Sequence, residues 1–427
     1  MKKVKIALIL LVICLLFSGC SNFRLSSIDD LITPVSPSGD DAGIIAAVND
    51  YCNGGYSIKI PTSGKYTTSF ISYDFDNSKT DEAIAFFERA DNLGTVDMAI
   101  IRKNADTWKV VSSISGDGAD VNCVDFCDIN SDGKEEIIVG WRVLSNSSTS
   151  NLCVYSVNEN FELTLLADSI TADDFICADI NNDSTNEILV FNVGSNSESP
   201  RAELYSFISG DKKRIGQTKL DNTIASFSNI ICGETDEGVS VFADAVKSNG
   251  DSMVTELLYW SNYYDSVISP FYSYSTGKTR DTSRNNMIIS RDIDGNGSIE
   301  IPADKSVKGL PNQLTAQNWV DYDSTVLKHC AFSVACRRDG YLIVIDDDLF
   351  DKLAFRYDED RRELSAVLDD TELFRIMTVI KSSYNSDNFA DYYEIFSDSG
   401  FVYLAAVNST DENVITVDDL KSCIKPY

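Results

Sequence analysis

Histidine is almost absent from this chain, which has one, His329, in 427 residues. A serine–histidine triad and a histidine-rich zinc site both need histidines at defined places, so a single one gives little basis for either. A lone histidine in a strand-like segment is most often an ordinary hydrogen-bonded or exposed residue. No glycine-rich phosphate loop follows a predicted strand, and no two cysteines are spaced as a Cys-x-x-Cys pair. We therefore identify no catalytic residue and expect a protein that is not an enzyme.

Basic residues are also scarce, because 36 Lys and Arg stand against 66 Asp and Glu, for a formal charge of −30. Such a surface repels nucleic acid and anionic lipid headgroups and attracts cations. A hydrophobic fraction of 43% is nevertheless enough to fill a sizeable core. We expect a folded protein, a monomer, that binds no nucleic acid.

Long apolar runs are missing except near the start, where Ile6–Phe17 follows three lysines and precedes Ser18, Gly19 and Cys20. Twelve apolar residues rise only about 18 Å as a helix, too short to span a bilayer. This order of regions is typical of a secretory signal, expected over residues 1–19. Cys20 after Ser-Gly resembles the lipobox of bacterial lipoproteins, which implies lipidation of Cys20 and anchoring to the outer face of the cytoplasmic membrane. An ordinary signal peptide with a chance cysteine is the alternative.

Eleven cysteines are present, and removal of Cys14 with the signal and lipidation of Cys20 would leave nine, an odd number. Cys127, Cys177 and Cys232 fall at nearly the same place in successive repeats, just before a loop. A small buried residue beside a strand end explains that position better than a disulfide does. We expect mostly free, buried thiols.

Four copies of one acidic pattern recur along the chain, beginning 54, 51 and 113 residues apart. Each places oxygen-bearing side chains at positions 1, 3, 5 and 9 of a short loop. The side chains are Asp74, Asp76, Ser78 and Glu82; Asp128, Asn130, Asp132 and Glu136; Asp179, Asn181, Asp183 and Glu187; and Asp292, Asp294, Asn296 and Glu300. Ligands spaced in this way can surround a hard cation such as Ca²⁺, with a backbone carbonyl at position 7 (Lys134, Ser298) completing the shell.

The period of about 50 residues indicates a repeat architecture, and each unit contains short β-branched and aromatic runs separated by turn residues. Four such runs per unit are typical of one propeller blade. The last interval is about twice the others, and Ile230–Phe242 fits the same frame with Gly233 in place of the first acid. We therefore expect a fifth unit that holds no metal.

The repeated pattern resembles the FG-GAP/VCBS repeat of integrin-like β-propellers. In that family a calcium loop joins two strands of each blade, and seven blades are usual. The resemblance implies a mainly β protein, with a propeller of four-stranded blades over residues 57–325. Five units are readable in this sequence, and up to seven are possible.

The flanking regions differ from the repeats. Residues 20–40 are rich in Ser, Asp and Pro and predict a tether, and residues 41–56 predict a short helix and lead-in, capped by Asp40 or Asp41. Residues 330–427 predict a small α+β domain that closes with a helix started by Thr416. The alternative is that these strands supply the remaining blades.

The four loops differ in their fitness for a cation. Gly133 and Gly297 supply the flexible sixth position, so we expect Ca²⁺ to bind most tightly at the loops that begin at Asp128 and Asp292. Ser184 takes that position in the third loop, so we expect weaker Ca²⁺ binding there. Lys79 places an ammonium group in the first loop, so we expect this loop to have the lowest affinity for Ca²⁺. The alternative is an Asx-rich turn whose carboxylates cap backbone amides and bind nothing. Any Ca²⁺ would be structural.

An aromatic cluster could instead mark a binding surface, because exposed Tyr and Trp stack on sugars or anchor proteins. Its members are Tyr259, Trp260, Tyr263, Tyr264, Phe271, Tyr272 and Tyr274. Their alternation along two strands is also what a blade core requires, and we favour the core.

Two classes of function remain. The first is a membrane-anchored, extracytoplasmic propeller, not an enzyme, that binds a protein or glycan partner at the cell envelope. The second is an extracytoplasmic polysaccharide hydrolase or lyase, since two carboxylates suffice for glycosidase chemistry. The single histidine and the regular loops favour the first.

Overall fold

The computed structural model describes residues 39–427 apart from 77, 79–81, 145–148, 196–197, 209, 324 and 409–414. The expected signal peptide, Cys20 and nearly all of the tether lie outside the described residues. In the part of the chain that is described, no helix has the length and apolar character needed to cross a membrane.

The first half of the fold contains three antiparallel sheets, each formed by consecutive strands. Blade 1 consists of β1 (Tyr56–Lys59), β2 (Phe70–Tyr73), β3 (Glu82–Arg89), β4 (Val96–Asn104) and β5 (Thr107–Ser115). Blade 2 consists of β6 (Asp120–Cys127), β7 (Glu136–Arg142), β8 (Ser150–Val157) and β9 (Leu163–Ala172). Blade 3 consists of β10 (Asp174–Ala178), β11 (Glu187–Asn192), β12 (Arg201–Ser206) and β13 (Lys213–Lys219). In blades 2 and 3 the strand order follows the sequence, as in a propeller blade.

The second half adds three five-stranded sheets and a small hairpin. Blade 4 consists of β14 (Ile224–Thr235), β15 (Gly238–Lys247), β16 (Met253–Ser261) and β17 (Ser266–Ile268), with β20 (Ser283–Arg284) paired to β16. The hairpin contains β18 (Tyr272–Ser273) and β19 (Lys278–Thr279). Blade 5 consists of β21 (Ile301–Lys305), β22 (Leu314–Asp323), β23 (Val326–Cys336), β24 (Tyr341–Ile345) and β30 (Ile424–Pro426). Blade 6 consists of β25 (Leu353–Asp358), β26 (Glu363–Leu368), β27 (Thr371–Ile380), β29 (Phe401–Val407) and β28 (Tyr393–Ser397).

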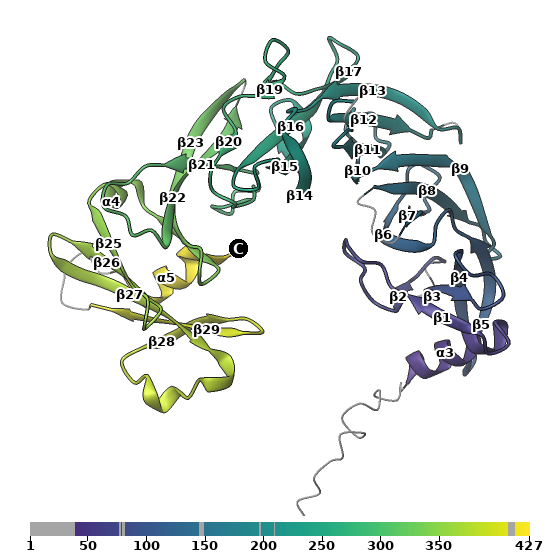
Figure 1. The fold of residues 1–427 in the computed structure, drawn as a ribbon, viewed down its shortest axis with the longest axis horizontal. Helices are drawn as coiled ribbons and strands as arrows, with labels where there is room; N and C mark the ends of the chain where they lie inside the picture. Colours follow the sequence, from purple (N-terminus) through teal and green to yellow (C-terminus); the bar gives the residue numbers. More distant parts are fainter. Residues whose placement is uncertain are drawn as a thin grey trace, which may run out of the picture.

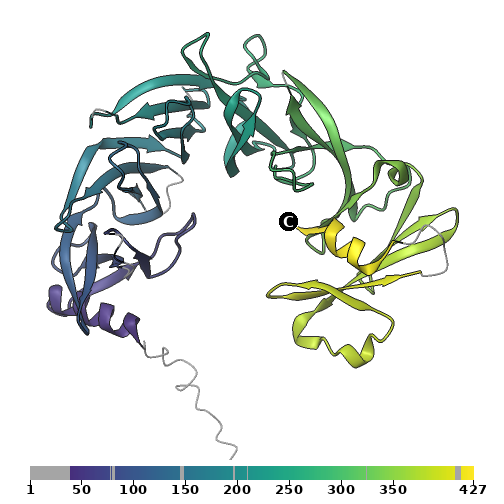
Figure 2. The same ribbon diagram turned by 180° about the vertical axis from the view of Figure 1, so that it is seen from behind.

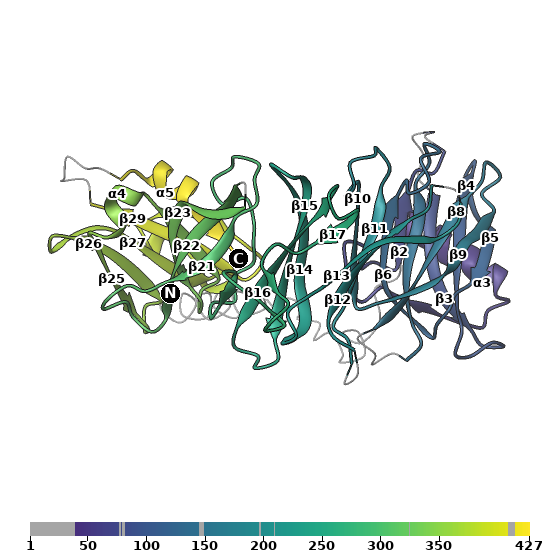
Figure 3. The same ribbon diagram turned by 90° about the horizontal axis from the view of Figure 1, so that it is seen from above.

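The six blades follow one another about a common axis in an open arc, with β6, β10 and β14 nearest the centre (Figure 1). The view from behind shows the same arc, with α3 (Asp40–Tyr51) beyond blade 1 and blade 6 at the opposite end (Figure 2). Seen from above, the blades stand side by side in a single layer (Figure 3). The fold is thus mainly β, a propeller of antiparallel blades.

Side chains that alternate along each strand join one blade to the next. In β3, Ile84 and Phe86 pack into a buried cluster with Val139 and Trp141 of blade 2. The side chains between them point the other way, and Phe87 packs with residues of α3. The same alternation continues along the arc, so every blade is buried on both faces, as stacked repeats require.

The chain itself covers both ends of this stack. Ile44 and Val48 of α3 lie on the outer face of blade 1. At the other end, Tyr384, Phe389 and Tyr392 pack against the buried Leu404 of blade 6. The two terminal faces are therefore capped, as in repeat proteins whose ends do not close into a ring.

The N-terminal helix forms as expected, but its cap does not. The N-cap residue is Gly39, and the Asp40 carboxylate instead accepts hydrogen bonds from Lys103 Nζ (2.6 Å) and Trp108 Nε1 (3.2 Å). The Asp40 carboxylate oxygen that could have capped the helix is therefore bound to Lys103 and Trp108 of blade 1. At the C-terminal end, Thr416 does start α5 (Val417–Cys423), through a capping box with Asp419.

The boundary expected between residues 325 and 330 falls inside one hairpin. Strands β22 and β23, on either side of it, pair along their lengths, and β24 and β30 extend the same sheet. The hydrophobic core continues across it, since Val334 of blade 5 clusters with Ile376 of blade 6 and Leu420 of α5. The division into domains stays a prediction.

The fifth readable unit is blade 4, where a tight turn at Asp236 and Glu237 replaces the acidic loop. Gly233 lies within β14 and pairs with Ser240 rather than opening a loop. A Cβ atom at Gly233 would lie 2.6 Å from Ile299 Cγ1 of the next blade. Close packing between blades therefore explains this glycine.

None of the nine cysteines among the described residues forms a disulfide. Cys127, Cys153 and Cys336 are buried, and the other six are half-buried. This agrees with thiols that act as small packing groups.

Candidate functional site

Each acidic loop joins two antiparallel segments, and the residue before the loop pairs with the final glutamate of the loop. The loop from Asp128 connects β6 to β7, and the loop from Asp179 connects β10 to β11. The loop from Asp74 connects β2 to β3, and the loop from Asp292 ends at β21 after an isolated bridge between Arg291 and Glu300. Since these connections are equivalent in each blade, the loops lie on one face of the propeller.

The loops share one hydrogen-bonding scheme, seen clearly in the loop from Asp292. Asp292 Oδ2 accepts from Gly297 N (3.0 Å), and Asp294 Oδ1 accepts from Asn296 N (3.1 Å). The Glu300 Oε2 atom accepts from Ile293 N (2.8 Å), and the Ile293 side chain is buried below the loop. The backbone therefore curls around its own carboxylates, as in a cation-binding loop or an Asx turn.

The loops differ in whether the Oε1 atom of the final glutamate has a hydrogen-bond partner. In the loop from Asp292, Glu300 Oε1 is buried and has no hydrogen-bond partner among the described residues. Carboxylate oxygens of Asp292, Asp294 and Glu300 all lie within 4.8 Å of one another. Burial, together with the neighbouring carboxylates, raises the pKa of Glu300 to about 7. A cation here would pair the orphaned oxygen and cancel the repulsion.

The loop from Asp179 has the same signature. Glu187 Oε1 is buried without a partner, and Oε2 accepts from Ile180 N (3.0 Å). Burial raises the pKa of Glu187 to about 7. Ser184 has a φ of 71° at the position where the loops from Asp128 and Asp292 have Gly133 (83°) and Gly297 (91°). This serine therefore carries backbone strain that the glycines avoid.

The loop from Asp128 satisfies its glutamate internally. The Asn130 side-chain amide donates to Glu136 Oε1 (2.8 Å), and Ile129 N donates to Oε2 (3.2 Å). Burial still raises the pKa of Glu136 to about 7. A cation in this loop requires the Asn130 amide to present its oxygen instead of its nitrogen.

The loop from Asp74 already contains a positive group. Arg102 Nη2 lies 2.8 Å from Asp76 Oδ2, and its Nε lies 3.2 Å from Glu82 Oε1. Carboxylate oxygens of Asp74, Asp76 and Glu82 also lie within 4.8 Å of one another. Lys79, to which the sequence assigned the unfavourable charge, lies outside the described residues. Sequence reasoning missed Arg102 because it comes from β4, beyond the loop.

A second feature lies on the axial side of blades 2, 3 and 4, where a cavity of about 450 Å³ borders β6, β10 and β14. Asp125, Asp174, Asn229 and Lys65 contribute polar groups to its lining. Burial raises the pKa of Asp125 and that of Asp174 above the usual range of a carboxyl group. Each accepts one hydrogen bond from the following backbone N–H (2.9 and 2.8 Å). These groups can exchange hydrogen bonds with a polar ligand.

No protein family and no curated protein matched the sequence. Among the solved structures, 126 chains match, and three of them illustrate the low similarity. Sqt1 from Chaetomium thermophilum is 10% identical with a TM-score of 0.34, over 62% of this chain and 66% of that one. The Dos1 propeller is 10% identical with a TM-score of 0.33, over 76% and 74%. The exotype rhamnogalacturonan lyase YesX is 12% identical with a TM-score of 0.26, over 75% and 72%. Likenesses this distant give no information on activity or ligand.

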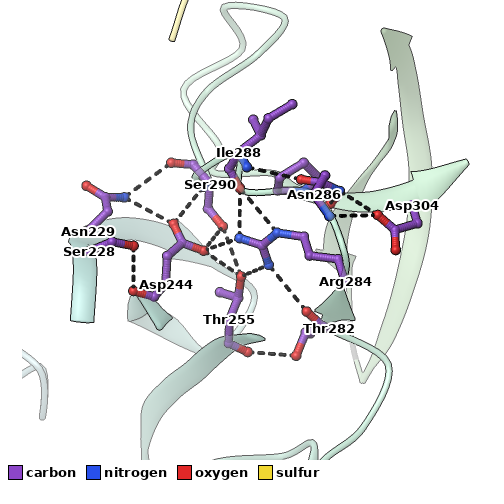
Figure 4. Close-up of polar contacts among 11 residues, drawn as sticks. Ser228, Asn229, Asp244, Thr255, Thr282, Arg284, Asn286, Ile288, Ser290 and Asp304 are labelled. Carbon is purple, nitrogen blue, oxygen red and sulfur yellow. Dashed lines mark hydrogen bonds and ion pairs between the residues drawn. The ribbon is translucent and has the colours of Figure 1, made fainter. Parts of the chain in front are cut away.

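The single histidine has ordinary structural contacts. His329 Nε2 lies 2.9 Å from Asp347 Oδ2, Nδ1 contacts Asn318 Oδ1, and the ring lies against Phe332. The fully buried ion pair between Arg284 and Asp244 (2.8 Å) is structural too (Figure 4). Arg284 also donates to the Ile288 carbonyl, so the network holds the segment before the Asp292 loop against β15.

The aromatic cluster divides between two environments. Tyr259 and Phe271 are buried in the core between blades 4 and 5, as expected. Tyr263, Tyr264 and Tyr274 are exposed, at 87%, 66% and 77%. Strand alternation alone did not distinguish these three exposed residues, which lie in turns, from the buried residues of the strands.

Proposed function

We propose that this protein is an exported, membrane-anchored β-propeller that binds a protein or glycan partner at the cell envelope and is not an enzyme. The axial cavity is the observation that supports it. A cavity of about 450 Å³, bordered by β6, β10, β14 and the connection between β1 and β2, offers carboxyl, ammonium and amide groups. Binding requires only such a shaped, polar surface on a rigid scaffold.

Structural Ca²⁺ in the blade loops is the second part of the proposal. The orphaned Oε1 atoms of Glu187 and Glu300 support it, because a buried carboxylate oxygen without a partner is costly. Together with Asp292, Asp294 and Asn296, or with Asp179, Asn181 and Asp183, they would form an oxygen-only ligand set. We place the loop from Asp292 first in affinity, and that from Asp74, with its arginine, last. Such loops also support membership of the FG-GAP/VCBS group.

Anchoring rests on the sequence alone. The charged, apolar and small-residue regions of residues 1–20 support lipidation at Cys20 and export to the outer face of the bacterial cytoplasmic membrane. One lipid chain holds a protein only marginally, so a lipoprotein-type anchor with several chains would give stable attachment.

A glycan array and a polysaccharide turnover assay, run on the same preparation, test binding against catalysis. We expect binding without turnover, and at least tenfold weaker binding by Asp125→Asn and Asp174→Asn, which border the axial cavity. Asp91→Asn is the matched control, since that carboxylate is 80% exposed. Turnover that disappears in either cavity variant would establish the hydrolase or lyase alternative, because a carboxyl group with a raised pKa can act as a general acid.

A further inference from the structure

We propose that a second pocket, between the outer strands of blade 3 and the β18–β19 hairpin, binds the carboxylate and ring of an acidic sugar. The pocket has a volume of about 600 Å³. Arg201, Arg214, Lys219, Gln217, Glu203 and Tyr274 line it. It is separate from the acidic loops and from the axial cavity, and the inference does not depend on the function proposed for them.

The register of β12 and β13 brings the polar lining together. Arg201 pairs with Lys219, and Glu203 pairs with Gln217, so these four side chains share one face of the sheet. A β-bulge at Leu204 and Tyr205 then shifts the register, and Arg214 pairs with Tyr205. Cross-strand pairing therefore collects three cations at one place.

The pocket is positive, although the whole chain carries a charge of −30. Glu203 is 5% exposed and holds both guanidinium groups, with Arg201 Nε at 3.3 Å and Arg214 Nη1 in contact. Glu198 pairs with Arg201 as well (2.9 Å). Three cations against two carboxylates leave one net positive charge. An anionic ligand is the complement of such a site.

Two donors in the pocket are available to a ligand. The Lys219 ammonium group and the Gln217 side-chain amide are exposed and form no ion pair or hydrogen bond among the described residues. The guanidinium groups are fixed by Glu203 and remain partly exposed, Arg214 at 49%. Pre-positioned guanidinium groups match the planar geometry of a carboxylate, and free donors suit the hydroxyl groups of a sugar.

Tyr274 supplies the ring-stacking surface. Its side chain is 77% exposed and packs edge-to-face with Tyr272. The base of its hairpin is held to the end of β13, because Asp221 Oδ2 accepts from Thr279 N (3.0 Å) and Asn222 N donates to the Gly277 carbonyl (2.9 Å). The tyrosine is therefore carried on a fixed element, and an exposed aromatic face beside cationic groups suits a uronic acid more than a neutral sugar.

Isothermal titration of the Ca²⁺-loaded chain with a trisaccharide of galacturonic acid tests this. We expect saturable binding, at least tenfold weaker for the fully methyl-esterified trisaccharide and weakened by salt. Tyr274→Ala and Lys219→Ala should each weaken binding about tenfold or more. Tyr263→Ala (87% exposed) and Lys213→Ala (same strand) remove equivalent groups outside the pocket, and we expect both to bind as the wild type does.

Absence of saturable binding by the wild type would overturn the proposal, as would equal binding of the esterified sugar. Equal losses of trisaccharide affinity in the pocket variants and in their control variants would also overturn the proposal. Since all four substitutions lie on exposed side chains, unfolding midpoints are expected to stay unchanged, and a thermal melt of each variant verifies this. Asp125→Asn, in the axial cavity, should leave uronate binding intact, which separates this site from the one proposed above.

Discussion

The guanidinium group of Arg102 lies where a cation would be held by Glu82: its Nε is 3.2 Å from Glu82 Oε1, the oxygen that has no partner in the equivalent Glu187 and Glu300. Arg102 also lies 4.2 Å from the centre of the Phe161 ring. The first blade therefore neutralises its acidic loop with its own side chain. This contact from β4 explains how one blade can keep the acidic pattern without metal.

Replacement of this arginine should create a cation site. In Arg102→Met, Asp76 and Glu82 lose their positive partner, so we expect one additional Ca²⁺ per molecule by equilibrium dialysis. Without Ca²⁺ the variant should lose about 1–3 kcal/mol of unfolding free energy, because a buried carboxylate becomes unpaired. Lys103→Met is the control, since Lys103 pairs with Asp40 outside the loop. If Arg102→Met bound the same number of Ca²⁺ ions as the wild type, the idea that Arg102 takes the place of a cation would be refuted.

Backbone strain at Ser184 can be measured by exchanging it with glycine. Ser184 has a φ of 71°, so Ser184→Gly should stabilise the chain by up to about 1 kcal/mol in urea unfolding. The inverse change at the equivalent position, Gly133→Ser, should destabilise by a similar amount, since Gly133 has a φ of 83°. If both substitutions changed the unfolding free energy in the same direction, backbone strain at this position would not be the cause of the changes.

Stability should fall as the pH rises when Ca²⁺ is absent. Burial raises the pKa of Glu256 to about 7, and the loop glutamates Glu136, Glu187 and Glu300 share that value. The folded state then binds more protons than the unfolded state between pH 4.5 and about 7, so the unfolding free energy is lost across that window. Urea unfolding at a series of pH values in EDTA measures the slope, and a rise of stability with pH would contradict it.

The contribution of Glu256 can be separated from that of the loops. Its Oε1 accepts from Asp221 N and Thr279 Oγ1 (both 2.7 Å), and neither partner belongs to an acidic loop. Glu256→Gln should therefore flatten the pH dependence by about one proton, both with and without Ca²⁺. Added Ca²⁺ should flatten only the part that comes from the loop glutamates.

Membrane anchoring has its own test. Cys20→Ser should release the chain from the membrane fraction of a bacterial expression host, because lipidation requires that thiol, while folding is unaffected. Equal membrane association of the wild type and Cys20→Ser would show that Cys20 is not the anchor. Cys52→Ser, at a half-buried free thiol, is the control.

The sequence predicted the repeat and the loops because both depend on local order. Positions 1 to 9 of each loop are contiguous, and every loop lies between two strands as expected. A contact that distinguishes the first loop comes from a strand outside it, because Arg102 of β4 pairs with Glu82. The pocket at Tyr274 likewise depends on β12, β13 and a hairpin of the next blade, which no local pattern brings together.

Thermal unfolding of the chain without residues 1–20, in EDTA and in Ca²⁺, tests the central claim that the acidic loops are cation sites of the blades. At a Ca²⁺ concentration about 100 times the dissociation constant, each site adds about 2.7 kcal/mol, so the midpoint should rise by several degrees. Glu300→Gln should lose part of that rise, whereas Asp91→Asn should keep all of it. The same midpoint in EDTA and in Ca²⁺ would contradict the claim.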